Sequence, residues 1–209
     1  MKSIKTLFFI IFTVLLLSQT PAHAQDGLST IMTMTIDGAV APASQQYLER
    51  AVNLAERQNA EILILQLNTP GGSIDTMNEM LQTIRGSHIP IIVYVSPKGA
   101  MAGSAGTIIT LAGHASAMAP ETIIGAASPI NLDGSEIGDT AKAKATEALK
   151  ATVRSLAERR GDEAIALAEA TIEEARAVSA TEALEVGLVD FIANDLGDLL
   201  TKLNGYEIT

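Results

Sequence analysis

The sequence predicts an α/β domain built on a largely parallel sheet. Apolar runs of strand length alternate with segments of helical periodicity along the 209 residues. Two of the strand-like runs are almost continuously apolar, which is typical of strands covered on both faces. Strand, helix and strand in alternation imply right-handed crossovers between neighbouring parallel strands.

The first half of the chain alternates three strands with two helices. We expect strands over residues 29–36, 60–67 and 90–96, and helices over residues 44–58 and 73–87. The first helix places its apolar side chains mostly on one face behind an N-cap at Ser44. Gly86 is expected to end the second helix.

The second half is richer in helices. We expect a helix from about Ser104, a long helix over about 140–158, short helices in "DEAIALAEA" and "SATEALEVG", a strand over 188–193 and a closing helix over 196–203. Ser179 with Glu182 three residues later forms a capping box at one of the short helices. No repeat or linker divides the chain, so we expect one compact domain.

The first 24 residues have the organisation of a secretory signal peptide. "MKSIK" carries two lysines, "TLFFIIFTVLLL" is apolar, and "SQTPAHA" ends in a small-residue cleavage signal after Ala24. We therefore expect residues 1–24 to be removed and residues 25–209 to form an exported domain. That domain has 12 basic against 24 acidic residues, which argues against nucleic-acid binding. The absence of cysteine excludes thiol catalysis and disulfides.

Two glycine-rich junctions follow buried strands. The first, "LNTPGGS", places Gly71 and Gly72 before a helix, where backbone amides can hold an oxyanion. The second, "KGAMAGSAGT", places Ser104 near a helix N-terminus, with the amide of Ala105 as a further donor. A tight turn and a plain N-cap serine are the simpler alternatives. Ala102 replaces the first glycine of the nucleophile elbow of α/β-hydrolases.

A nucleophilic serine requires a base. His88 precedes a strand at the opposite end of the sheet, and His114 lies beyond the helix that Ser104 opens, so a histidine triad has little support. A lysine whose pKa is lowered by burial can act instead. The candidates are Lys98, Lys142, Lys144, Lys150 and Lys202, and periodicity does not choose among them.

Five segments in this order, "LNTPGG", "GAMAGSAGT", "AMAPETIIGAASPI", "RSLAERRG" and "ATEALEVGLVD", resemble the NfeD-like membrane-bound serine proteases of the ClpP and signal peptide peptidase A superfamily. The resemblance implies a ClpP/crotonase-type fold of stacked β-β-α units and a Ser-Lys dyad without a cofactor. The family's serine corresponds to Ser104. Its base lies eleven residues before the serine of "SLA", which is Ser155 here, and so corresponds to Lys144. Gly71, Gly72 and Ala105 would form the oxyanion hole.

The function implied by this resemblance is a serine endopeptidase. It would cleave apolar segments of membrane-associated, stomatin-like proteins on the exported side of the membrane, as a homo-oligomer, a dimer or larger. Long members of the family continue into transmembrane helices, and we expect the proteolytic core to be intact in this sequence. The alternative is a non-catalytic adaptor that binds a stomatin-like partner. An acyl-CoA enzyme of the crotonase type ranks low, because export would separate it from its cofactor.

Overall fold

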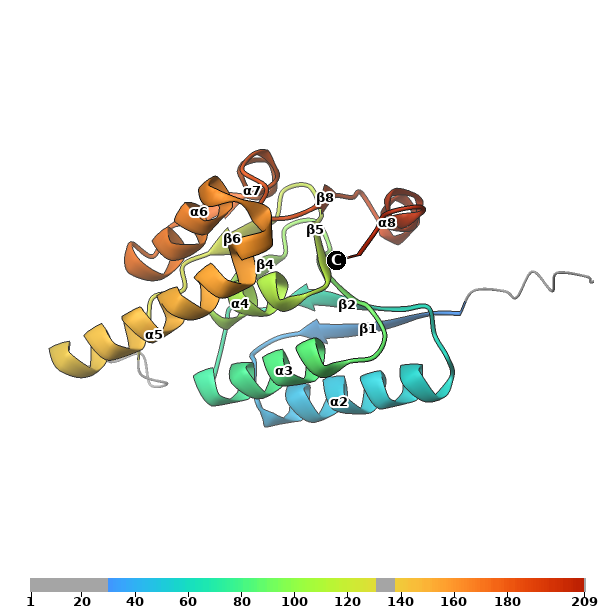
Figure 1. Ribbon diagram of the computed structural model, residues 1–209, viewed down its shortest axis with the longest axis horizontal. Helices are drawn as coiled ribbons and strands as arrows, with labels where there is room; N and C mark the ends of the chain where they lie inside the picture. Colours follow the sequence, from blue (N-terminus) through green and yellow to red (C-terminus); the bar gives the residue numbers. More distant parts are fainter. Residues whose placement is uncertain (1–29, 131–137, 209) are drawn as a thin grey trace, which may run out of the picture.

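The computed structural model describes residues 30–130 and 138–208, so the expected signal peptide lies outside the described residues. Its centre is a five-stranded sheet in the order β1-β2-β3-β5-β8, with every neighbouring pair parallel (Figure 1). The strands are β1 (Ile31–Asp37), β2 (Ile62–Asn68), β3 (Ile91–Val95), β5 (Ala115–Met118) and β8 (Phe191–Ile192). The expected α/β class with a parallel sheet is confirmed.

Two helices cover one face of this sheet. They are α2 (Pro42–Arg57) and α3 (Ile74–Gly86), and both pack apolar side chains against β1 and β2 (Figure 1). The helix α3 begins as expected behind Ser73, whose hydroxyl accepts a hydrogen bond from the amide of Thr76. The expected N-cap at Ser44 is wrong. Pro42 starts α2 two residues earlier, and the Ser44 hydroxyl instead accepts from the amide of the N-cap residue Ala41.

The opposite face of the sheet is covered by the closing helix α8 (Leu196–Leu203). Its Leu199 is fully buried with Ile64, Ile92 and Tyr94 in a second apolar cluster. The Tyr94 hydroxyl donates to the carbonyl of Ala193 at 2.8 Å, which ties β3 to the segment before α8. The central strands are therefore buried on both faces, as their continuous apolar runs predicted.

A second, smaller sheet stands beside the first and positions the site described below. It has the order β4-β6-β7, with β4 (Met101–Gly103) parallel to β6 (Ile123–Gly125) and β7 (Ala177–Ser179) antiparallel to β6. The sequence did not indicate these short strands or β5. A strand of three residues shows no periodicity of its own, and it forms here because distant segments supply its hydrogen bonds.

The remaining helices pack around this second sheet. They are α4 (Ala105–Ala112), α5 (Asp139–Ala157), α6 (Asp162–Glu173) and α7 (Ala180–Glu185), with a 3₁₀ turn at Glu158–Arg160. The capping box of Ser179 and Glu182 is present at the start of α7. The N-terminal end of α5 projects away from both sheets, whereas its C-terminal half packs on α6 (Figure 1).

Candidate active site

Ser104 occupies a sharp turn between the end of β4 and the first residue of α4. Its backbone has φ 51° and ψ −118°, a conformation that side-chain-bearing residues rarely adopt. Its hydroxyl makes no capping hydrogen bond to the helix that it precedes. Ser104 is thus the N-cap residue of α4 by position, but its side chain does not cap the helix. A strained, half-buried serine at a strand-to-helix turn is the arrangement of a nucleophile elbow.

Hydrogen bonds from neighbouring elements hold this strained turn. The amide of Ser104 donates to the carbonyl of Gly125 at 3.0 Å, and the amide of Thr107 donates to the carbonyl of Ser104 at 2.9 Å. The buried Thr107 hydroxyl donates to the carbonyl of Ala102 at 2.9 Å and accepts from the amide of Gly125 at 3.0 Å. The strands β4 and β6 of the small sheet and the helix α4 therefore determine the position of Ser104.

The glycine pair of the first junction lies against this serine. Gly71 has φ +116°, and a Cβ built on it would be 2.5 Å from the Cβ of Ser104. A Cβ on Gly72 would be 2.1 Å from the carbonyl oxygen of Val40. Neither position has room for a side chain. The two junctions, which are far apart in sequence, meet at the carboxyl ends of β2 and β4.

The backbone amides near Ser104 differ in whether they already donate a hydrogen bond. Within the described part of the chain, the amides of Gly72 and Ala105 donate no hydrogen bond. The amide of Gly71, in contrast, donates to the Thr69 hydroxyl at 3.1 Å. The expectation that both glycine amides are available is therefore corrected for Gly71, whose donor is turned to a buried neighbour. Sequence reasoning did not single out Thr69, although it stands beside Pro70 in the same motif.

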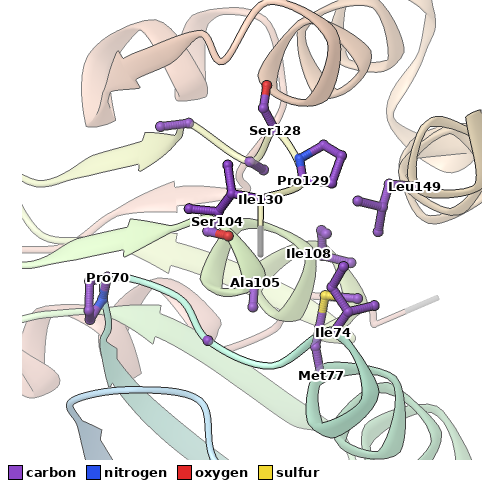
Figure 2. A pocket seen from close by; sticks show the side chains of 13 residues that line it. Pro70, Ile74, Met77, Ser104, Ala105, Ile108, Ser128, Pro129, Ile130 and Leu149 are labelled. Atoms are coloured by element: carbon purple, nitrogen blue, oxygen red, sulfur yellow. The ribbon is translucent and has the colours of Figure 1, made fainter. Parts of the chain in front are cut away.

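An apolar pocket of about 240 Å³ opens beside Ser104. Figure 2 shows Ser104 at its edge, with Ile74 and Met77 of α3 on one side and Leu149 of α5 across it. Its lining consists of Pro70, Gly72, Ile74, Met77, Ser104, Ala105, Ile108, Ala126, Ala127, Ser128, Pro129, Ile130 and Leu149. The segment after β6, residues 126–130, was not assigned to a site from sequence, and its one hydroxyl, that of Ser128, donates to the carbonyl of Ile172 at 2.6 Å. The pocket is suited to hold an apolar side chain.

The expected base does not lie in this pocket. Lys144 is exposed on the N-terminal half of α5 and is absent from the pocket lining. It precedes the lining residue Leu149 by five positions, about 140° around the helix. Lys142 precedes Leu149 by seven positions and shares its face to about 20°, although its side chain is also exposed. The structure thus brings Ser104 together with the glycine junction but brings neither lysine to it.

His88 and His114 lie at the other end of the sheet, as the sequence indicated. His88 is exposed before β3. His114 precedes β5, and its Nδ1 accepts a hydrogen bond from the amide of Ile91 at 3.1 Å. Burial lowers the pKa of His114, and the charge of Arg85 lowers it further. His114 is therefore a neutral structural residue.

Residues 30–130 and 138–208 contain no cluster of three or more His, Asp or Glu side chains that could hold a metal ion. No helix in the same ranges combines the length and the hydropathy that a membrane crossing requires.

Comparison with known families finds a match over most of the chain. Residues 30–208 match the family "NfeD1b, N-terminal domain". The membrane-bound protease PH1510 of Pyrococcus horikoshii is 41% identical over 174 residues, which cover 82% of this chain and 39% of that protein. The membrane protein NfeD1b of Bacillus subtilis is 29% identical over 197 residues, 88% of this chain and 43% of that protein. The chain thus spans well under half the length of both relatives.

Solved structures show the same fold. A 1510-N membrane-bound stomatin-specific protease with a lysine changed to alanine, in complex with a substrate peptide, superposes with a TM-score of 0.78 at 37% identity, covering 85% of this chain and 81% of that one. The same protease with a serine changed to alanine gives 0.78 at 36%, covering 86% and 87%. ClpP1 of Listeria monocytogenes gives 0.65 at 17%, covering 80% and 94%, and shows the fold alone. The expected ClpP-like fold is confirmed.

Proposed function

This chain belongs to the NfeD1b N-terminal domain family, and on that premise we propose that it is a serine endopeptidase. A relative that is 41% identical is described as a membrane-bound protease. Because this chain covers only 39% of that relative, the activity is proposed for this chain and not transferred from the whole protein.

One observation carries the proposal. Ser104 is held in a strained turn with its hydroxyl free of the helix, in the lining of the same apolar pocket as Gly72 and Ala105, whose amides donate no hydrogen bond within the described residues. Strain that the surrounding structure maintains, at a serine with amide donors in the same pocket, supports acyl transfer better than a purely structural turn.

In the proposed mechanism, Lys144 in its neutral form accepts the proton of the Ser104 hydroxyl as the oxygen attacks a peptide carbonyl. The amides of Gly72 and Ala105 stabilise the oxyanion, and Lys144 returns the proton to the leaving amine. Water then hydrolyses the acyl-enzyme by the same steps. Two solved structures of the 1510-N protease support this choice of residue types. In one, a lysine is replaced by alanine and a substrate peptide is bound, and in the other a serine is replaced by alanine.

The position of Lys144 sets a requirement on this mechanism. The lysine is exposed and on a different helical face from Leu149, so the start of α5 must rearrange for the Lys144 amine to reach Ser104. Lys142 is closer in helical phase and therefore provides the matched comparison. The same observation favours the second candidate function, a non-catalytic adaptor that holds a stomatin-like partner.

We propose apolar segments of stomatin-like membrane proteins as substrates. The apolar lining of the pocket supports this, as does the description of the 1510-N protease as stomatin-specific. The chain would act on the exported side of the membrane after removal of residues 1–24, as a homo-oligomer without a cofactor. N-terminal sequencing of the exported protein should begin at Gln25, and light scattering should give at least twice the mass of one chain.

The experiment that tests the function is proteolysis of casein and of an apolar stomatin-tail peptide. Wild type, Ser104→Ala, Lys144→Ala and Lys142→Ala are compared after each is shown to be folded. We expect cleavage by wild type and Lys142→Ala only. Cleavage that survives Ser104→Ala would refute the serine mechanism. Loss in Lys142→Ala with activity retained in Lys144→Ala would move the base to Lys142. A folded wild type that binds the peptide without cleaving it would establish the adaptor.

A further inference from the structure

We propose that Thr69 is a positioning residue that selects which backbone amide serves the oxyanion hole. Its hydroxyl holds the amide of Gly71 away from the site and leaves the amide of Gly72 as the donor beside Ser104. This inference rests on the proposed peptidase function, and it concerns a residue that is not itself among those that line the pocket.

The Thr69 side chain is fully buried, and both hydrogen bonds of its hydroxyl are to Gly71. Its Oγ1 accepts a hydrogen bond from the amide of Gly71 at 3.1 Å and donates to the carbonyl of Gly71 at 3.2 Å. One hydroxyl thus satisfies both polar groups of the same glycine. The carbonyl of Gly71 also accepts from the amide of Val40 at 2.8 Å, whereas its amide has the Thr69 hydroxyl as its acceptor among the described residues.

The backbone of Thr69 is fixed to the strand that leads to the nucleophile. Its amide donates to the carbonyl of Met101 at 2.8 Å, and its carbonyl accepts from the amide of Gly103 at 2.9 Å. Gly103 immediately precedes Ser104. The Thr69 hydroxyl is therefore placed relative to the same strand that positions the Ser104 Oγ.

The neighbours of Gly72 leave only its amide free at this turn. The amide of Val40 donates to the carbonyl of Gly71 at 2.8 Å, and the amide of Ser73 donates to the carbonyl of Val40 at 3.0 Å. With the Gly71 amide on Thr69, the amide of Gly72 is the one donor between residues 71 and 73 that lacks an acceptor among the described residues. It borders the pocket beside Ser104.

The methyl group of Thr69 contacts the first turn of α4, beside the second proposed amide donor, Ala105. A Cβ on Gly106 would be 2.6 Å from the Cγ2 of Thr69, so this methyl packs directly on the first turn of α4. Gly106 follows Ala105, the other proposed amide donor. Thr69 therefore contacts the neighbours of both proposed donors. Its hydroxyl binds Gly71, which precedes Gly72, and its methyl packs on Gly106, which follows Ala105.

A purely structural Thr69 and a positioning Thr69 differ in what their loss changes. If Thr69 is purely structural, its loss lowers the free energy of unfolding and leaves the kcat of the folded protein intact. If Thr69 positions the oxyanion hole, its loss lowers kcat with KM retained, because the hole stabilises the transition state and not the bound substrate.

The test compares Thr69→Val and Thr69→Ser with Thr122→Val. Valine keeps the shape of threonine and removes the hydroxyl, whereas serine keeps the hydroxyl and removes the methyl. Thr122 is equally buried, its hydroxyl donates to the carbonyl of Ala119, and it is not among the pocket-lining residues, so it controls for the loss of a buried hydrogen bond. For each folded variant, kcat, KM and the affinity for a peptide boronic acid, which forms a tetrahedral adduct at a nucleophilic serine, are measured.

We expect Thr69→Val to lower kcat on the order of 10- to 100-fold with KM nearly unchanged, and to weaken boronate binding by a similar factor. Thr69→Ser should retain most of the wild-type kcat, and Thr122→Val should match wild type. Equal kcat in Thr69→Val and Thr122→Val would overturn the inference. So would an equal loss in Thr69→Ser and Thr69→Val, because the methyl contact would then be responsible.

Two further outcomes are decisive. If Thr69→Val does not fold, Thr69→Ala replaces it, and a kcat equal to that of Thr69→Ser refutes a role for the hydroxyl. A folded wild type that neither cleaves peptides nor binds the boronate would refute the peptidase function itself and the inference with it. An active wild type with an unaffected Thr69→Val would refute the inference alone.

Discussion

Gly71 lies so close to Ser104 that a methyl group on the glycine would stand 3.0 Å from the serine Oγ. The two residues come from junctions that are more than thirty positions apart. Their contact places the backbone of the first junction beside the proposed nucleophile. Any side chain at position 71 would collide with Ser104.

Gly71→Ala should therefore abolish activity. We expect a loss of at least about 100-fold in kcat/KM, because the methyl displaces Ser104 or blocks the carbonyl, and the positive φ adds strain on the order of 1–3 kcal/mol. Peptidase kinetics and urea unfolding measure the two effects. The control is Gly86→Ala, at a helical glycine with nothing within 4 Å of the added methyl. Near-wild-type activity in Gly71→Ala would contradict the observed contact.

Ser104→Gly should be more stable than Ser104→Ala, although both should be inactive. Alanine retains the strained φ of 51°, whereas glycine adopts it readily. We expect a difference of about 1 kcal/mol in the free energy of unfolding, measured by urea denaturation. If alanine proved as stable as glycine at this position, the turn would not be strained, and the main argument for a nucleophile elbow would be lost.

Ile130→Ser should raise KM for apolar peptides while leaving stability unchanged. The Ile130 side chain is 63% exposed and borders the pocket, so its loss removes substrate contact without opening the core. Steady-state kinetics on peptides with an apolar or a polar residue at the cleavage site would show the effect for the apolar peptide alone. Ile123→Ser is the matched control, at a 45% exposed isoleucine outside the pocket lining. Equal KM values of the two variants for the apolar peptide would show that the substrate does not contact Ile130.

His114→Asn should retain activity and change only the pH dependence of stability. Burial holds the pKa of His114 below its ordinary value of 6.5, so the unfolded chain binds a proton there more readily than the folded one. The wild type should therefore lose stability as the pH falls below about 6.5, and the asparagine variant should lose less. The Asn Oδ1 can accept the hydrogen bond from Ile91 in place of Nδ1. Thermal melting between pH 7.5 and about 5 checks this expectation.

A large fall in peptidase activity of His114→Asn would contradict the structural role assigned here. The geometry makes this outcome unexpected, because His114 lies before β5, whereas Ser104 follows β4 at the other end of α4. The two variants Ser104→Ala and His114→Asn together separate a serine mechanism that uses lysine from one that uses histidine.

Four strands of the central sheet, β1, β2, β3 and β8, could be predicted from the sequence, as could the long helices, whereas β5 could not. The apolar runs of β2 and β3 and the periodicities of α2, α3 and α5 are local patterns that arise from burial on one or both faces. The second sheet could not be predicted, because β4, β6 and β7 each have three residues and depend on hydrogen bonds between distant segments. Ser44 shows the limit at helix ends, where Pro42 determined the start of α2.

By itself the sequence determined that Ser104 and the Gly71–Gly72 pair follow buried strands, that neither histidine suits a triad, and that five ordered motifs resemble one family. Only the tertiary structure decided that Gly71 contacts Ser104, that its amide belongs to Thr69, and that Lys144 is exposed. The physical reason is that a residue's type and spacing set the local conformation, whereas the partner of each backbone amide depends on how separate segments pack together.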